Sequence, residues 1–245
     1  MNGDGSIIAV GSSTFHVVIE FSGTDWVQRG NAISCPLDQN GMAASAVAIS
    51  SNRRFLVTAC AADDTAGLDA GIVGVWEYIN NGWSNRQVFS GESPGDRFGQ
   101  SVAISYNGVL LVVGAPYRTG NETEVSDIEG FGWSVALSNE WQRLIVGAPG
   151  DDSSVAFNIG QAFVFEFLPV PIRAYLATSR PLEAEGLSDL FGYAVATNGD
   201  GSIYAIGGPA NTGRFSIYSG HVRVFRRGGE DETLVKMGSD IDGPE

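Results

Sequence analysis

Short apolar runs separated by glycine-rich turns extend along the whole sequence. The stretch from Gly95 to Pro116, GDRFGQSVAISYNGVLLVVGAP, contains two such runs, VAI and VLLVVGAP, joined by Tyr-Asn-Gly. Two β-prone runs joined by turn residues predict a β-hairpin. No long stretch shows a clear apolar period of 3.6 residues, so the pattern predicts no helix of consequence.

The same hairpin recurs, which predicts a repeat protein. Its first strand begins near Val47, Val102, Val135 and Val195. Except for one shorter interval, the spacing is about 55 residues, which is typical of propeller blades. The second strand ends in small residues, as in Gly114-Ala115-Pro116 and Gly147-Ala148-Pro149. The near-continuous apolar runs before these triplets predict strands buried on both faces, including Val112, Val113, Ile145, Val146 and Ile206.

Two further strands follow most hairpins. The third strand begins after Gly71, Gly160 and Gly220, and HVVIEF from His16 matches it. The fourth begins at Trp26, Trp83 and Leu234. Four short antiparallel strands per repeat predict an all-β fold, a β-propeller of four-stranded antiparallel blades. We expect a single domain over residues 1–245, with five units at approximately 1–38, 39–92, 93–129, 130–185 and 186–245.

Two features predict an incompletely closed ring. The unit at 93–129 is truncated, because its GAP triplet is followed by the next hairpin without clear third and fourth strands. The first unit lacks a first strand, and the last unit ends where a new first strand would start. We therefore expect either a gap between residues 7–10 and residues 222–225 or an edge that another molecule covers. Self-association, or membership of a larger parent chain, follows from this expectation.

Phe-Gly pairs precede the GAP triplets. Phe98-Gly99, Phe131-Gly132 and Phe191-Gly192 each open a hairpin, whereas the second unit has Ala43-Ala44 and ends its hairpin in Ala59-Cys60-Ala61. This pattern resembles the FG-GAP repeat of integrin α-chain propellers and of many secreted proteins. The resemblance implies an extracellular or cell-surface protein that binds a protein or glycan ligand through its blade loops.

The formal net charge of the chain is −14. A nucleic-acid-binding protein needs a basic surface, so this composition argues against a nucleic-acid partner. It also disfavours an anionic membrane surface, and no apolar run is long enough to insert in a membrane. The acidic balance fits either simple solubility or cation binding in acidic loops.

The chain has two cysteines, Cys35 and Cys60, too few for a disulfide framework or a zinc site. A single bridge is compatible with an extracellular setting. Cys60 takes the place of the small central residue of a GAP triplet, which favours a buried, packed thiol over a bridged one.

The family resemblance implies calcium in the first hairpin loop, in a pattern like D-x-N-x-D-G-x-x-D. Residues 198–201, Asn-Gly-Asp-Gly, fit its middle, but Ala196 and Tyr204 occupy its ends. The same turn at residues 2–5 has Ile8 at the last position. Both are therefore interpreted as tight hairpin turns that do not bind calcium.

Acidic loops after the GAP triplets are the remaining calcium candidates, because calcium prefers several converging carboxylate oxygens. The candidate ligands are Asp63, Asp64, Asp69, Asp151 and Asp152. Glu122, Glu124 and Asp127 form a third acidic loop, which also contains a glycosylation sequon at Asn121. Solvated loop charge is the competing interpretation, and no other cofactor is expected.

Catalytic signals are weak. There is no G-x-S-x-G motif, and no acidic residue lies inside the apolar strand runs. His16 and His221 lie near the starts of third strands, and the pattern of GHVRVFRR predicts that His221 is exposed. Tyr117, Trp133 and Tyr193 are the aromatic residues best placed to contact a ligand, although core packing is the competing interpretation for the last two.

We therefore predict a non-catalytic recognition or adhesion module with no catalytic residues. Two alternatives of other classes stay open. One is a carbohydrate-active hydrolase on a propeller scaffold, and the other is a structural subunit that docks through an open edge.

Overall fold

The computed structural model describes most of the chain. The described residues are 1–12, 14–35, 45–118, 130–140, 142–151, 159–168, 174–178, 181–184, 186, 188–211, 219–228 and 233–243. They form two compact units, Met1–Arg118 and Thr119–Glu245, each of which is described by itself.

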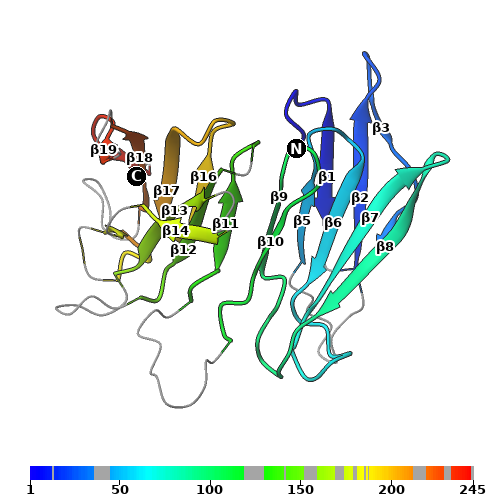
Figure 1. The fold of residues 1–245 in the computed structure, drawn as a ribbon, viewed down its shortest axis with the longest axis horizontal. Helices are drawn as coiled ribbons and strands as arrows, with labels where there is room; N and C mark the ends of the chain where they lie inside the picture. The colour runs from blue at the N-terminus through cyan, green and yellow to red at the C-terminus, as the bar shows by residue number, and fades with distance from the viewer. Residues whose placement is uncertain are drawn as a thin grey trace. The chain divides into compact units, whose positions relative to one another are not determined.

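The first unit contains three antiparallel sheets (Figure 1). The first sheet consists of β1 (Ile7–Gly11), β2 (Phe15–Phe21), β3 (Trp26–Gln28) and β4 (Ile33–Ser34). The second consists of β5 (Ser45–Ile49), β6 (Phe55–Cys60), β7 (Ile72–Ile79) and β8 (Gly82–Ser90). The third is the hairpin of β9 (Ser101–Ile104) and β10 (Leu111–Gly114). Each chain segment turns back on the preceding strand, as the repeated turn residues predict.

The second sheet forms the middle of the first unit, because it has an apolar core on each face. One core joins it to the first sheet through Ile7, Val18, Leu56 and Trp83, all buried. The other core joins Val57, Ala59 and Val73 to the hairpin residues Phe98, Val102 and Val113. Burial on both faces is what the near-continuous apolar run of β6, FLVTAC, requires.

The second unit contains two five-stranded antiparallel sheets. One consists of β11 (Ser134–Leu137), β12 (Arg143–Ala148), β13 (Gln161–Leu168), β14 (Ala174–Ala177) and β15 (Leu182–Glu183). The other consists of β16 (Ala194–Thr197), β17 (Ile203–Gly208), β18 (His221–Arg227), β19 (Leu234–Lys236) and β20 (Ile241–Asp242). A shared core of Ile145, Ala162, Val164, Phe191, Tyr204, Ile206 and Phe225 holds them together.

The fourth strand is divided into two pieces in three of the sheets. Both β3 and β4 pair with β2, both β14 and β15 pair with β13, and both β19 and β20 pair with β18. Gly30 and Gly238 lie in two of the interruptions with φ of 75° and 71°, a backbone conformation that glycine adopts at low cost. The fourth strand of the second sheet, β8, stays continuous and has a register shift opposite Val75 and Trp76.

The prediction of an all-β fold made of antiparallel hairpins and added strands is confirmed. The predicted count of about five units, one of them truncated, differs slightly in detail, because the described residues form four sheets of four or five strands and one sheet of two. Ile145, Val146 and Ile206 are buried as predicted, whereas Val112 and Val113 are only half-buried in the two-stranded sheet. That the chain is one domain stays a prediction.

The preference for an unbridged Cys60 was wrong. Cys35 and Cys60 are both buried and form a disulfide across 25 residues. Cys35 follows β4 of the first sheet and Cys60 ends β6 of the second, so the bond ties two sheets together. Cys35 and Cys60 are 4% and 5% exposed, and a packed thiol would be buried as well, so burial at the GAP position alone does not distinguish a bridged cysteine from a free one.

Candidate functional site

The Phe-Gly pairs and the ends of the GAP strands lie together, and they position the loops at that end of each sheet. Phe98 donates its backbone N–H to the carbonyl oxygen of Ala70 at 3.0 Å. A Cβ on Gly71 would lie 2.1 Å from the carbonyl oxygen of Phe98, so only glycine allows this approach. A Cβ on Gly99 would in turn lie 2.9 Å from the Ala59 and Val73 side chains. The hairpin β9–β10 is thus held against β6 and β7 by backbone contact.

The second unit repeats this contact. Phe191 donates its backbone N–H to the carbonyl oxygen of Ile159 at 3.0 Å. A Cβ on Gly160 would lie 2.2 Å from the carbonyl oxygen of Phe191, and one on Gly147 would lie 1.9 Å from that of Gly192. We call such a place, where a sheet receives the Phe-Gly pair of the next hairpin, an FG seat.

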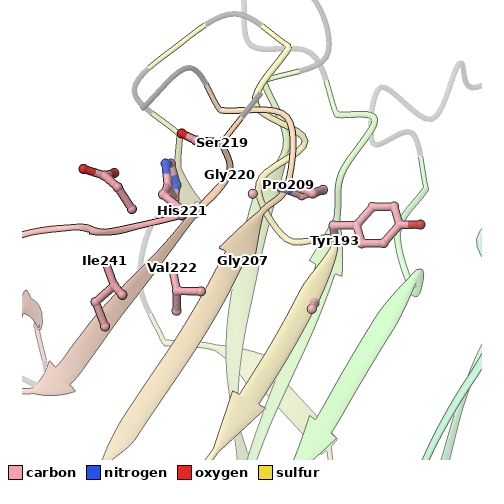
Figure 2. A pocket seen from close by; sticks show the side chains of 12 residues that line it. Tyr193, Gly207, Pro209, Ser219, Gly220, His221, Val222 and Ile241 are labelled. Carbon is pink, nitrogen blue, oxygen red and sulfur yellow. The ribbon is translucent and has the colours of Figure 1, made fainter. Parts of the chain in front are cut away.

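A pocket of about 380 Å³ lies on the last sheet of the second unit. Figure 2 shows Tyr193 on one side of it, Val222 and Ile241 on the other, and Ser219 and His221 at the end where the loops lie. The rest of its wall is largely glycine backbone, including Gly207, Gly208, Gly220 and Gly243.

Buried polar side chains gather beside the rim of this pocket, at the GAP end of the sheet. The Asp189 carboxylate accepts hydrogen bonds from the backbone N–H of Gly186 and from the Asn211 amide nitrogen, each at 2.9 Å. His221 lies directly opposite Asp242 in the pairing of β18 with β20, and its ring centroid is 5.8 Å from that of Phe191. Directly opposite residues project from the same face of a sheet, so His221 and Asp242 share one face.

The predicted exposure of His221 was wrong, because only 5% of it is exposed. In β18, His221 and Phe225 are buried on the face that packs on the neighbouring sheet, and Val222 projects from the other face. The alternation in GHVRVFRR thus predicted the wrong face of β18 as the exposed one. His16, at the start of a third strand in the first unit, is also buried, and burial lowers the pKa of its imidazole.

A buried ion pair lies two residues further along the same face of β18. The Arg223 guanidinium donates to both carboxylate oxygens of Asp240, at 3.1 and 3.3 Å. Burial opposes ionisation of Asp240, but the hydrogen bonds from Lys236 and Arg223 prevail and lower the pKa of its carboxyl. Since both charges of the pair are satisfied, Arg223 serves to fix the sheet beside His221.

The candidate calcium ligands occupy loop positions that recur for a structural reason. The backbone carbonyl oxygens of Asp63 and Asp151 accept from the glycine before the third strand, at 3.0 and 3.1 Å. The Asp63 carboxylate accepts from the Thr65 N–H, and the Asp64 carboxylate accepts from the Asp69 N–H. No group of three or more metal-ligating side chains occurs among the described residues. Asp152, Asn121, Glu122, Glu124 and Asp127 lie outside the described residues, and calcium binding stays a prediction.

The Asn-Gly-Asp-Gly turns are held by their own side chains. Asp4 accepts from the backbone N–H and the hydroxyl of Ser6, and these bonds hold the pKa of its carboxyl well below the usual range. Asp200 accepts from the Ser202 hydroxyl and, at 2.8 Å, from the Ser202 N–H, and these bonds lower the pKa of its carboxyl too. Such closed hydrogen bonding agrees with the interpretation of both segments as hairpin turns.

Two of the three candidate ligand-binding aromatics contact each other. The rings of Trp133 and Tyr193 lie 5.3 Å apart, tilted by 45°. Both follow a Phe-Gly pair, at the starts of the first strands of neighbouring sheets. Tyr117 is half-exposed in the first unit, with the Arg97 guanidinium 5.4 Å from its ring centroid.

The FG-GAP prediction is confirmed by a family comparison. Residues 88–126 and 123–165 match the model of the FG-GAP repeat, so the chain contains FG-GAP repeats. A search of curated protein sequences returned no match to the chain. The described part of the chain contains no helix that could serve as a membrane span.

The fold is similar to that of two solved structures. A candidate 6-phosphogluconolactonase from Bacteroides fragilis aligns with 97% of the chain and 67% of its own, at TM-score 0.60 and 11% identity. A periplasmic gluconolactonase from Pseudomonas aeruginosa aligns with 96% of the chain and 66% of its own, at TM-score 0.61 and 14% identity. The chain thus spans about two thirds of the length of each. These alignments support the propeller-type arrangement of antiparallel sheets.

The prediction of a non-catalytic recognition or adhesion module was wrong by this comparison, as was the prediction that the chain is not an enzyme. Both neighbours are named as lactonases, and neither name indicates adhesion. The alternative of a hydrolase on a propeller scaffold agrees better with them. Sequence reasoning also missed Asp189 and Asp242, because nothing in their local pattern shows which strands they oppose.

Proposed function

We propose that the chain is a hydrolase that opens a sugar-derived lactone, with His221 and Asp242 at the centre of the reaction. The observation that carries the proposal is the direct opposition of these two residues on β18 and β20. An imidazole beside a carboxylate is the usual pair for moving a proton to or from water. The fold, which resembles those of a candidate 6-phosphogluconolactonase and of a gluconolactonase, supports a lactone as the substrate class.

In the proposed reaction, His221 removes a proton from a water molecule as that water attacks the lactone carbonyl carbon. Asp242 orients the imidazole and stabilises the imidazolium ion that forms. Collapse of the tetrahedral intermediate breaks the bond between the carbonyl carbon and the ring oxygen. The imidazolium then returns its proton to that oxygen, which leaves as the hydroxyl of the open-chain acid.

The charge of the chain favours a substrate without a phosphate group. With a formal net charge of −14, the protein repels a dianion unless a local cation attracts it. The basic residue nearest to His221 along β18, Arg223, already pairs with Asp240. A neutral aldonolactone therefore fits better than a phosphorylated one.

The disulfide supports a compartment outside the reducing cytosol, since such bonds persist mainly in oxidising environments. An extracellular or periplasmic location is part of the proposal. A periplasmic protein among the structural neighbours agrees with it.

The test is hydrolysis of glucono-1,5-lactone, followed by pH-stat titration of the released acid and corrected for the spontaneous rate. General acid–base groups contribute about 10²–10⁴-fold to rate, so His221→Gln should lower kcat by at least about 10²-fold. Glutamine is a conservative choice, because Gln161 occupies the same register position in the neighbouring sheet, opposite Glu183. Asp242→Asn should lower kcat as well, with a smaller effect on KM.

Two matched controls separate catalysis from stability. His16→Gln changes the histidine at the start of a third strand in the other unit, and Glu183→Gln changes the acid opposite Gln161. Both controls should keep the activity of the parent. Equal losses in His221→Gln and His16→Gln, or no hydrolysis by the parent above the spontaneous rate, would count against the proposal.

A further inference from the structure

A row of small and apolar residues crosses the sheet of β16 to β20 and lines the pocket of Figure 2. Strand pairing places Ala194 opposite Gly207 and Gly207 opposite Val222. Val222 lies in turn opposite Ile241. The row therefore takes one residue from each of β16, β17, β18 and β20. Neighbouring strands lie about 4.8 Å apart, so the row extends about 14 Å across the sheet.

The two largest side chains of this row are accessible to a ligand. Val222 is 38% exposed and Ile241 is 60% exposed. Because directly opposite residues project from the same face of a sheet, these two side chains form one apolar surface. Removal of apolar surface from water is favourable, so the part of a ligand that covers this pair should itself be apolar.

The glycine backbone of the pocket offers few further hydrogen bonds, because its peptide groups already have partners. The carbonyl oxygen of Gly207 accepts from the N–H of Gly192 at 3.1 Å. The carbonyl oxygen of Gly220 accepts from the N–H of Gly243 at 2.9 Å, and the N–H of Gly220 donates to the carbonyl oxygen of Asn211 at 3.1 Å. A ligand hydroxyl that lost its water against this wall would be left without a partner, which is unfavourable.

The polar side chains that can reach a ligand gather at the loop end of the pocket. Figure 2 shows Ser219 and His221 there, and Asp242 lies opposite His221 in the strand pairing. The other polar side chain of the lining belongs to Tyr193. Its hydroxyl points away from His221 in Figure 2, and its ring lies 5.3 Å from that of Trp133. The pocket thus combines one polar end with an apolar row.

We propose that this pocket accepts δ-lactones that carry a linear alkyl chain, as a second class of substrate beside the sugar-derived lactones. The alkyl chain lies along the row that contains Val222 and Ile241, and the lactone carbonyl lies at the polar end with His221 and Asp242. For its chemical step this inference rests on the proposed function. Water adds to the carbonyl carbon, the bond from that carbon to the ring oxygen breaks, and the ring oxygen takes up a proton. The product is an open-chain hydroxy acid, and water is the only co-reactant.

The experiment compares δ-valerolactone, which has no substituent, with δ-lactones that carry methyl to heptyl chains on the carbon next to the ring oxygen. Hydrolysis by the whole chain is followed by pH-stat titration and corrected for the spontaneous rate. Binding of a non-reacting group contributes to kcat/KM. A fully buried methylene is worth about fourfold in an equilibrium constant, so a chain covered on one side should raise kcat/KM about twofold per methylene. The heptyl lactone should therefore exceed δ-valerolactone by about 10²-fold in kcat/KM.

Two variants at exposed positions test the row. Val222→Ser and Ile241→Ser should each lower kcat/KM for the heptyl lactone at least about tenfold more than for δ-valerolactone. Val109→Ser, which changes an 80% exposed valine of the first unit, should leave the whole series unchanged. Circular dichroism and thermal melting check that all three variants fold like the parent.

Saturation-transfer NMR measures binding of the alkyl chain separately from hydrolysis. The probe is heptyltetrahydropyran, a cyclic ether with the same ring size and chain that has no ester bond to hydrolyse. The protons of its chain should receive saturation from the parent protein and much less from the Val222→Ser variant.

Equal kcat/KM along the alkyl series in the parent would overturn the inference, as would equal relative losses for the heptyl and unsubstituted lactones in the two row variants. If glucono-1,5-lactone were hydrolysed without any gain from an alkyl chain, only the inference would be wrong. Hydrolysis of the alkyl lactones without that of glucono-1,5-lactone would support the inference and contradict the sugar-derived substrate. If no lactone were hydrolysed, both would be wrong, and saturation of the ether would leave the row as a binding site alone.

Discussion

Replacing Gly147 with alanine should destabilise the second unit, whereas the equivalent change at Gly207 should not. At Gly147 the new Cβ would lie 1.9 Å from the carbonyl oxygen of Gly192 and 2.4 Å from the Ser134 hydroxyl. Both are far inside contact distance, so the start of β16 must move. At Gly207 the nearest atoms lie 3.8 Å away, which is an ordinary contact.

The expected magnitudes follow from these contacts. Overpacking of a close contact costs about 1–3 kcal/mol. Loss of the hydrogen bond from the Ser134 hydroxyl to the Gly192 carbonyl adds about 1 kcal/mol. Replacing glycine reduces the entropy of the unfolded chain, which offsets about 0.4–1 kcal/mol. Gly147→Ala should therefore lose about 2–3 kcal/mol, and Gly207→Ala should be neutral or gain up to about 1 kcal/mol.

Differential scanning calorimetry compares the two variants with the parent. At roughly 2–4 °C per kcal/mol, Gly147→Ala should lower the Tm of the transition that contains the second unit by about 4–12 °C. Gly207→Ala should leave Tm unchanged or raise it slightly. If Gly147→Ala melted like the parent, the Phe-Gly pair would not rest on β12. If Gly207→Ala lost as much as Gly147→Ala, the last sheet would already be covered.

Three further predictions concern the first unit. Replacing both Cys35 and Cys60 with alanine should lower the free energy of unfolding by about 3 kcal/mol in urea titrations, because the bond closes a loop across 25 residues; unchanged stability would contradict this. The buried Glu77 receives hydrogen bonds from Arg54 and Arg86, which lower the pKa of its carboxyl, so the stability it provides is present above the ordinary value of 4.5 and lost as pH falls below it. Glu77→Gln should therefore be less stable at neutral pH and show a shallower loss of Tm on acidification, and a parallel pH profile would refute this. Burial lowers the pKa of His16 below 6.5, so unfolding takes up a proton and stability falls as pH drops below 6.5; His16→Gln should remove that dependence, which thermal melts across this range can detect.

Local signals were sufficient for the strands and turns. The repeated pattern of Phe-Gly, a short apolar strand, a turn and a GAP strand locates β9 and β10, β11 and β12, and β16 and β17. Turn residues and the alternation of apolar and polar residues act over a few positions. They can therefore be recognised without knowing which strands pair with each other. The third strands followed for the same reason. The division of the fourth strands could not be predicted from the sequence, because it depends on how those strands pair with the third strand.

Which face of a strand is buried needed the tertiary structure. In β18 both faces carry apolar and polar side chains, and only the neighbouring sheet decides that His221 is covered while Val222 is exposed. The opposition of His221 and Asp242 likewise depends on the register between β18 and β20. Register is a property of two segments and cannot be deduced from either one alone.

The sequence by itself determined that the chain builds FG-GAP hairpins with glycine at fixed places, because those glycines serve local turns and close backbone approaches. Only the tertiary structure decided which of these approaches are filled. Gly71 and Gly160 meet the backbone of Phe98 and Phe191, whereas Gly220 faces a pocket, although all three have the same backbone conformation. The glycine and the Phe-Gly pair that packs on it belong to different repeats. Their contact therefore depends on how the sheets stack, and no sequence pattern within one repeat predicts it.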